Sequence, residues 1–230
     1  MTKNLFWTGG FDSTFRLLQL IDDNEVLEIN LYYISIVIDN IESSEIRRKS
    51  NIYEIQTMYQ ILSNINIEKI KSFTIFGKNE DLLHYSFIFN FPFMNYINRD
   101  SIEYSDKNKV FYFDLFVNGL VLRPINQWGG ITQILDDLDI EAEICLEKGG
   151  GIWSKINKYV VNGEIQYDLF KPLKAFSNYQ IPLFDIDREE MVNISSNKNW
   201  DDILKITWSC WYPKNNLPCG RCFTCKRRPF

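Results

Sequence analysis

Strands and helices alternate through the first third of the chain, and this order limits its fold more than any other feature. A short apolar run, Leu5–Trp7, stops at a Gly-Gly turn, and apolar residues at helical spacing follow. Ile29–Ile38 is nearly continuous β-branched and aromatic sequence, as expected of a strand covered on both faces. A helix opened by Ser43 and running to about Ser63, then a strand over Ile70–Phe76, complete a β-α-β-α-β order. This order predicts an α/β fold with a doubly wound parallel sheet and right-handed crossovers.

The rest of the chain carries weaker patterns. Between Gly77 and Gly130 several aromatic and apolar runs fit either strand or buried helix, and a short helix is expected just after them. Gly149–Gly151 predicts a loop, whereas Asp185–Met191 and Trp200–Ile206 look like short helical pieces. No internal repeat and no low-complexity linker is found.

Composition narrows the class of protein. The 230 residues are 45% hydrophobic and 24% charged, a balance that excludes disordered and collagen-like chains. No apolar run approaches the roughly 20 residues that cross a bilayer, and no signal peptide is visible at the N-terminus. We therefore expect a cytoplasmic protein without a membrane partner. Five cysteines, an odd and clustered number, argue against a disulfide framework.

Four of the five cysteines lie in the last 21 residues, spaced C-x8-C-x2-C-x2-C. Two residues between cysteines let neighbouring thiolates reach one ion, and zinc prefers four tetrahedral ligands. Because thiolates would fill every position, the ion is expected to be structural. An iron-sulfur cluster is the alternative, but the spacing differs from the common ferredoxin runs. The expected ligands are Cys210, Cys219, Cys222 and Cys225.

The charge is unevenly distributed around this cysteine cluster. The formal net charge is −5, yet residues 210–230 hold five basic and no acidic side chains, which leaves −10 on residues 1–209. A basic tail can mark a phosphate or nucleic-acid contact. The interpretation we prefer is that lysine and arginine stabilise the zinc-bound thiolates.

The second motif that carries chemistry is the turn after the first strand. Two glycines permit close backbone approach to a ligand, and the start of a helix presents unpaired N–H groups and a positive dipole end. Ser13 and Thr14 can add hydroxyl donors, while Asp12 can cap the helix or hold magnesium near phosphates. Neither the usual NTPase loop nor a dinucleotide fingerprint is present. The turn, Thr8-Gly9-Gly10-Phe11-Asp12-Ser13-Thr14, therefore predicts a phosphate site.

Together, TGGFDST after the first strand and TWSC followed by C-G-x-C-x-x-C resemble the 7-cyano-7-deazaguanine synthases, the QueC family of PP-loop ATP pyrophosphatases. That family usually has serine where this chain has Thr8, a change that keeps the hydroxyl. The resemblance implies an ATP-binding α/β domain over residues 1–206, a zinc-binding subdomain over residues 207–230, and a homodimer.

The resemblance also implies a reaction. ATP activates the carboxylate of 7-carboxy-7-deazaguanine as an acyl-adenylate, ammonia attacks, and the amide is adenylated again and dehydrated to the nitrile. Asp12 and Ser13 would be catalytic, with magnesium accompanying ATP. The implied ATP-binding residues are Thr8, Gly9, Gly10, Phe11, Asp12, Ser13 and Thr14.

The middle of the chain departs from the family's pattern. Its V-P-x-R-N segment is not found, and the nearest candidates for substrate contacts are Arg123 and Asn126. The chain is then also compatible with a QueC-like paralogue that passes an activated deazapurine to a protein or nucleic-acid amine.

Two further hypotheses come from other classes. Related PP-loop enzymes thiolate tRNA, and Cys145 would be the sulfur carrier, although a buried free thiol is its default interpretation. A non-catalytic zinc module binding nucleic acid is disfavoured by the acidic body. His84, the only histidine, is assigned no role, and Arg47–Lys49 fit a solvated helix face.

Overall fold

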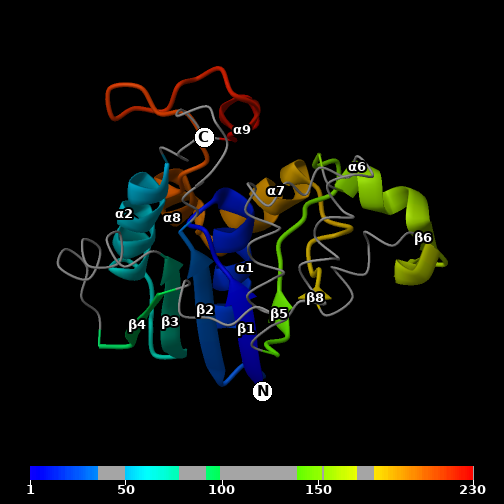
Figure 1. Ribbon diagram of the computed structural model, residues 1–230, viewed down its shortest axis with the longest axis horizontal. Coiled ribbons are helices and arrows are strands. Elements are labelled where there is room, and N and C mark those ends of the chain that lie inside the picture. The colour runs from blue at the N-terminus through cyan, green and yellow to red at the C-terminus, as the bar shows by residue number, and fades with distance from the viewer. Residues whose placement is uncertain (36–49, 78–91, 99–138, 152, 170–178, 230) are drawn as a thin grey trace.

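A computed structural model of the protein describes residues 1–35, 50–77, 92–98, 139–151, 153–169 and 179–229 (Figure 1). Its sheet strands are β1 Thr2–Phe6, β2 Glu28–Ile34, β3 Ile70–Gly77, β4 Met94–Asn98, β5 Ala142–Glu143 and β8 Tyr179–Gln180, and a separate hairpin is formed by β6 Val160–Val161 and β7 Glu164–Ile165. The helices are α1 Phe11–Asp22, α2 Asn51–Leu62, α6 Trp153–Ile156, α7 Arg188–Lys198, α8 Asp201–Ile206 and α9 Phe223–Lys226, with short 3-10 turns η2 Asn157–Tyr159 and η3 Tyr167–Leu169.

The main sheet is parallel throughout, with strand order β4-β3-β2-β1-β5-β8. From β1 the chain builds outward through β2 and β3 to β4, then returns to place β5 on the other side of β1. This reversal confirms the predicted doubly wound α/β fold. In such sheets, ligands bind at the carboxyl ends of the strands where the order reverses, here between β1 and β5.

Helices α1, α2, α7 and α8 are held together by burial against the sheet and one another. One cluster joins apolar residues of β1, β2 and β3 to α1 and α2, with Trp7, Leu17 and Met58 fully buried. A second joins α1 to α7 and α8 through Phe15, which meets Trp200 edge-on at 5.8 Å between ring centroids. Helix α8 contacts α1, α2 and α7, and so it connects the helices of both clusters.

The first strand and the second helix can be compared with the bounds that the sequence predicts. The first strand covers Thr2–Phe6 rather than Leu5–Trp7, since its pairing with β2 begins at Thr2. The described part of the second helix covers Asn51–Leu62, where Ser50 Oγ donates to Glu54 Oε1 at 2.9 Å, and its predicted start near Ser43 lies outside the described residues. The predicted segments over residues 36–49, 78–91, 99–138 and 170–178 lie outside the described residues.

The short helical piece predicted over Asp185–Met191 overlaps the start of an eleven-residue helix, α7, which begins at Arg188 and continues to Lys198. Asp187 caps it by accepting the Glu190 N–H at 2.9 Å, and Asn199 ends it in the left-handed conformation, at φ 58°. The predicted helix over Trp200–Ile206 is confirmed as α8.

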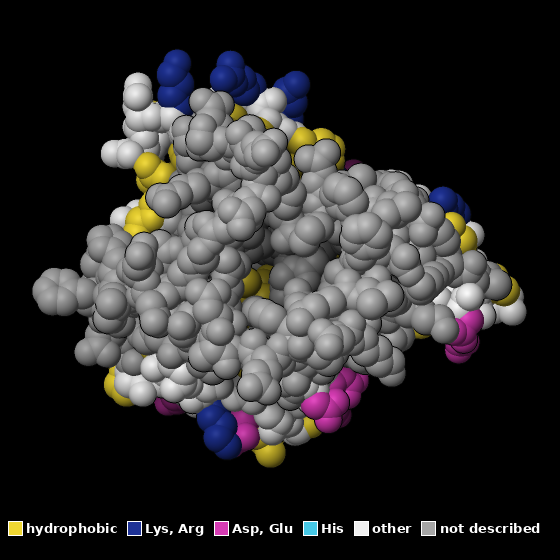
Figure 2. All heavy atoms as spheres, in the orientation of Figure 1, with side chains coloured by type: hydrophobic (Ala, Val, Ile, Leu, Met, Phe, Trp, Pro, Cys, Tyr) yellow, Lys and Arg dark blue, Asp and Glu magenta, His cyan; other side chains and the backbone are white. Residues whose placement is uncertain are grey.

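The tail after α8 lies above the carboxyl ends of the strands, at the top of Figure 1. Figure 2, in the same orientation, shows Lys and Arg side chains gathered there. Among the described residues no helix is long and apolar enough for a bilayer crossing.

At Gly9 the loop after β1 packs directly against helix α2. Its φ is +66°, and a Cβ atom there would lie 2.8 Å from Met58 Cγ and 3.2 Å from the Glu54 carbonyl oxygen. Gly10 has φ −77°, and its nearest contact would be the Thr8 hydroxyl at 3.2 Å. The first glycine of the pair is therefore required by packing as well as by backbone conformation.

We predict that Gly9→Ala lowers the free energy of unfolding by about 2 to 3 kcal/mol, because it combines a left-handed backbone with a clash against α2. Gly10→Ala is the matched control and should cost less than half as much. Urea denaturation followed by circular dichroism measures both. Equal losses for the two variants would contradict this packing role of Gly9.

Candidate functional site

The turn after β1 forms a tight loop at the start of α1. Ser13 Oγ lies 3.2 Å from both the Thr8 backbone N–H, which donates to it, and the Thr8 hydroxyl. Gly10 is the N-cap of α1 and provides no side chain. The loop backbone therefore curves around Ser13 at a helix start, a geometry suited to an anion.

The predicted loop residues have different positions in the structure: some line the turn, and others pack behind it. Thr14 is fully buried, and its hydroxyl oxygen accepts the Trp7 indole N–H at 3.1 Å, so it packs behind the loop. The sequence predicts that Asp12 either caps α1 or holds magnesium. In the structure Asp12 lies inside the first turn of α1 and does not cap the helix. Its carboxylate instead pairs with Arg188, Nη2 to Oδ1, at 2.7 Å.

Asp12 belongs to a cluster of charges at the point where the strand order reverses. Glu147, which follows β5, meets the same Arg188 guanidinium, Nε to Oε2, at 2.7 Å. Desolvation raises the pKa of Asp12 to about 6, and the nearby Arg188 opposes this rise. At neutral pH the carboxylate is still mostly ionised. Sequence reasoning missed Glu147 and Arg188, because only the fold brings them to the loop.

The tail joins the loop through backbone contacts. The Trp208 N–H donates to the Gly9 carbonyl at 3.0 Å, and a Cβ on Gly10 would lie 3.7 Å from the Trp208 carbonyl oxygen. Thr207 is buried, and its hydroxyl donates to the Leu204 carbonyl at 2.6 Å, which fixes the exit from α8. The two motifs that the sequence singled out thus touch.

The four tail cysteines converge, with all four Sγ atoms within 4.8 Å of one another. The Cys219 N–H donates to Cys210 Sγ at 3.2 Å, and the Cys222 N–H donates to Cys219 Sγ at 3.3 Å. Backbone N–H groups pointing at sulfur are what a thiolate metal site requires. The cluster can therefore hold a metal ion, and its all-thiolate ligand set fits structural zinc.

The thiols of this cluster are electrostatically unequal without a metal. Desolvation opposes ionisation of Cys222, but hydrogen bonds with the Thr224 hydroxyl and with backbone N–H groups outweigh it and lower the pKa of this thiol to about 6. Desolvation, followed by the neighbouring thiols, raises the pKa of Cys225 to about 12. Metal binding must therefore displace protons, which makes it pH-dependent.

Cys145 stands apart, beside the loop rather than in the tail. It is partly buried and packs against both apolar clusters. Desolvation, reinforced by Asp12 and Glu143, raises the pKa of this thiol well above its ordinary value. A protonated thiol is a poor nucleophile, so this environment is unlike that of a reactive sulfur carrier.

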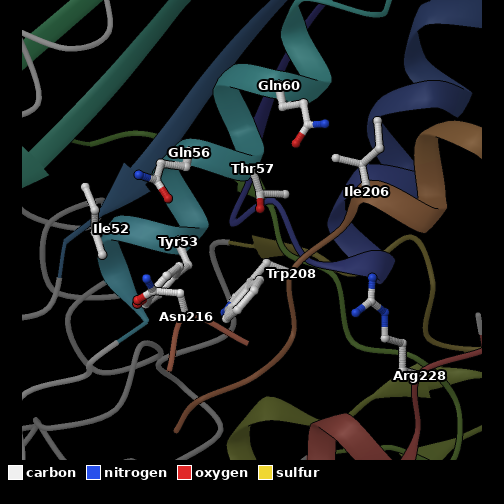
Figure 3. A pocket seen from close by; sticks show the side chains of 9 residues that line it. All are labelled: Ile52, Tyr53, Gln56, Thr57, Gln60, Ile206, Trp208, Asn216 and Arg228. Carbon is white, nitrogen blue, oxygen red and sulfur yellow. The ribbon is translucent and has the colours of Figure 1, made fainter. Parts of the chain in front are cut away.

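A pocket with a volume of about 550 Å³ opens between α2, the end of α8 and the tail (Figure 3). Tyr53 and Trp208 stack in it at 4.8 Å between ring centroids, and the Tyr53 hydroxyl donates to Asn216 at 2.6 Å. Arg228 faces them from the other side of the pocket. The remaining lining residues are Ile52, Gln56, Thr57, Gln60 and Ile206.

These features define a doubly wound α/β protein in which the turn at the start of α1 touches a four-cysteine tail. The model of the family described as queuosine biosynthesis protein QueC matches residues 165–229. The match confirms the QueC-like resemblance over that part of the chain, which includes Trp208 and the four cysteines. No curated protein and no solved structure matches the chain. The loop at residues 8–14 lies outside the matched range, and the predicted contacts Arg123 and Asn126 lie outside the described residues.

For the cysteine cluster we predict one zinc ion per chain, lost almost completely in Cys222→Ser because three thiolates no longer close the tetrahedron. Cys145→Ser removes the fifth thiol and should leave the metal content unchanged. Elemental analysis of the purified variants measures both. A brown, iron-containing protein, or equal metal loss in the two variants, would contradict this assignment.

Proposed function

We propose that this protein is a QueC-like ATP-dependent ligase that converts 7-carboxy-7-deazaguanine to its amide and nitrile with ammonia. One observation carries the proposal: the Trp208 N–H donates to the Gly9 carbonyl at 3.0 Å. Trp208 lies within the range matched by the QueC model, whereas Gly9 belongs to the TGGFDST turn. The contact between the turn and the matched tail, about 200 residues apart in the sequence, therefore supports their acting together in one QueC-like site.

The turn is the proposed site of the ATP phosphates. The Ser13 hydroxyl and the first N–H groups of α1 would stabilise charge developing at the α-phosphate when the substrate carboxylate attacks it. Pyrophosphate then leaves, and the acyl-adenylate presents AMP as a good leaving group to ammonia. The turn mainly binds and orients, so the chemistry needs little acid-base catalysis. Magnesium, when bound with ATP, would neutralise phosphate charge beside Asp12.

The tail is the proposed second domain, residues 207–230, after an ATP-binding domain over residues 1–206. Zinc held by the four cysteines would supply a fixed scaffold and no reacting atom. Arg228 supports this docking, since its Nη2 donates to the Lys205 carbonyl at 2.7 Å.

The pocket beside Trp208 is the proposed place for the planar heterocycle. Tyr53 and Trp208 give it an aromatic wall, and Gln56, Gln60 and Arg228 supply hydrogen-bonding groups around that wall. Arg228 also offers a positive charge for the substrate carboxylate. Arg123 and Asn126 remain predicted substrate contacts.

The test is to incubate the zinc-loaded protein with ATP, magnesium, 7-carboxy-7-deazaguanine and ammonia, and to identify products by mass spectrometry. We expect AMP, pyrophosphate, the amide and the nitrile. Ser13→Ala should slow product formation by about 100-fold, because it removes a donor to developing charge. Ser63→Ala, an exposed serine just after α2, is the matched control and should retain the wild-type rate.

Other products would identify the competing functions. AMP release that needs a protein or nucleic-acid amine instead of ammonia would favour the paralogue. Thiolated RNA that disappears in Cys145→Ser would favour the sulfurtransferase. Absence of AMP, amide and nitrile would overturn the proposed ligase.

A further inference from the structure

Four charged side chains connect the cysteine tail to the loop after β1. Arg227 Nη2 lies 2.5 Å from Glu147 Oε1, and the other oxygen of Glu147 lies 2.7 Å from Arg188 Nε. Arg188 Nη2 in turn lies 2.7 Å from Asp12 Oδ1. The charges alternate along this series, from a residue two positions after Cys225 to the first turn of α1.

The series is enclosed at its centre. The Glu147 side chain is only 6% exposed, so its charge must be compensated by the two guanidinium groups. Arg227 Nη2 pairs with one carboxylate oxygen of Glu147 and Arg188 Nε pairs with the other, while Arg188 Nη2 pairs with Asp12. Without Arg227, Glu147 would compete with Asp12 for both nitrogens of Arg188.

Aromatic rings and a backbone group fix both arginines in place. The Arg188 guanidinium lies 4.5 Å from the centroid of the Phe11 ring, next to Asp12 in the sequence. The Arg227 guanidinium lies 5.3 Å from the Phe223 ring, and its Nη1 donates to the Gly149 carbonyl at 3.3 Å. These contacts limit the freedom of both arginines.

We propose that Arg227, Glu147 and Arg188 are positioning residues that hold the Asp12 carboxylate, so that the tail sets the affinity of the loop for the magnesium complex of a nucleoside triphosphate. This inference rests on the proposed function only in assigning the nucleotide to the loop. The three residues act through Asp12 and need not touch the nucleotide.

Arg227→Gln tests this role, with Lys226→Gln as the matched control. Lys226 is exposed and adjacent, so its substitution removes the same charge from the tail without breaking the series. We expect Arg227→Gln to weaken binding of magnesium-ATP by about tenfold in calorimetry, within the usual range of coupling between sites. Lys226→Gln should bind as wild type does. Arg227→Lys keeps the charge but loses the planar fork, and should lie between them.

The same effect must depend on Glu147. In a Glu147→Gln background, Arg227→Gln should weaken binding no further, because the carboxylate through which it acts is gone. Fully additive losses would overturn the proposal. If Arg227→Gln instead acted by losing zinc, it would weaken binding further in the Glu147→Gln background as well, because Glu147 lies outside the tail.

Hydrogen exchange separates this inference from the proposed function. The peptide covering residues 8–16 should exchange faster in Arg227→Gln than in Lys226→Gln, with no nucleotide present. If wild-type protein fails to bind magnesium-ATP, the proposed function is wrong, but faster exchange in Arg227→Gln would still show that the series from Arg227 to Asp12 positions the loop. Unchanged exchange of this peptide in Arg227→Gln, or an affinity of Arg227→Gln for magnesium-ATP within about twofold of wild type, would overturn the inference.

Discussion

Everything at the carboxyl edge of this sheet depends on how the turn after β1 is held. Helix α2 closes on Gly9 from one side, where even a Cβ atom would lie 2.8 Å from Met58 Cγ. The tail reaches the same residue from the other side, through the Trp208 N–H at 3.0 Å. The backbone of the turn is thus fixed by its neighbours, and Ser13 is presented at the start of α1 without a special side-chain cap.

The uneven charge of the chain acquires a structural explanation. The sequence predicts that the tail's basic residues stabilise the thiolates, and in the structure two of them also dock the tail. Arg227 reaches the buried Glu147 carboxylate, and Arg228 donates to the Lys205 carbonyl. A positive charge of the tail therefore pairs with a buried negative charge of residues 1–209, at the point where the strand order reverses beside β1.

The sequence was most informative where its signals are local. Strand and helix order, the Gly-Gly turn and the cysteine spacing follow from short patterns, and the fold and the cysteine cluster were predicted from them. Helix α7 was underestimated because it is largely polar; its extent is marked by the Asp187 cap and the left-handed Asn199 rather than by an apolar stripe. The series from Arg227 to Asp12 could not be predicted, because its members come from the tail, the segment after β5, the start of α7 and the first turn of α1, which only the fold brings together. The substrate contacts remain predictions for a similar reason, since Arg123 and Asn126 carry no local pattern specific enough to identify them.

The central claim is that the turn and the four-cysteine tail form one ATP-dependent site. A crystal structure of the zinc-loaded protein with magnesium and a non-hydrolysable ATP analogue tests it most directly. The account predicts zinc bound by all four tail cysteines and the α-phosphate within hydrogen-bonding distance of Ser13 and the first N–H groups of α1. A nucleotide bound elsewhere, with the turn unoccupied, would contradict it.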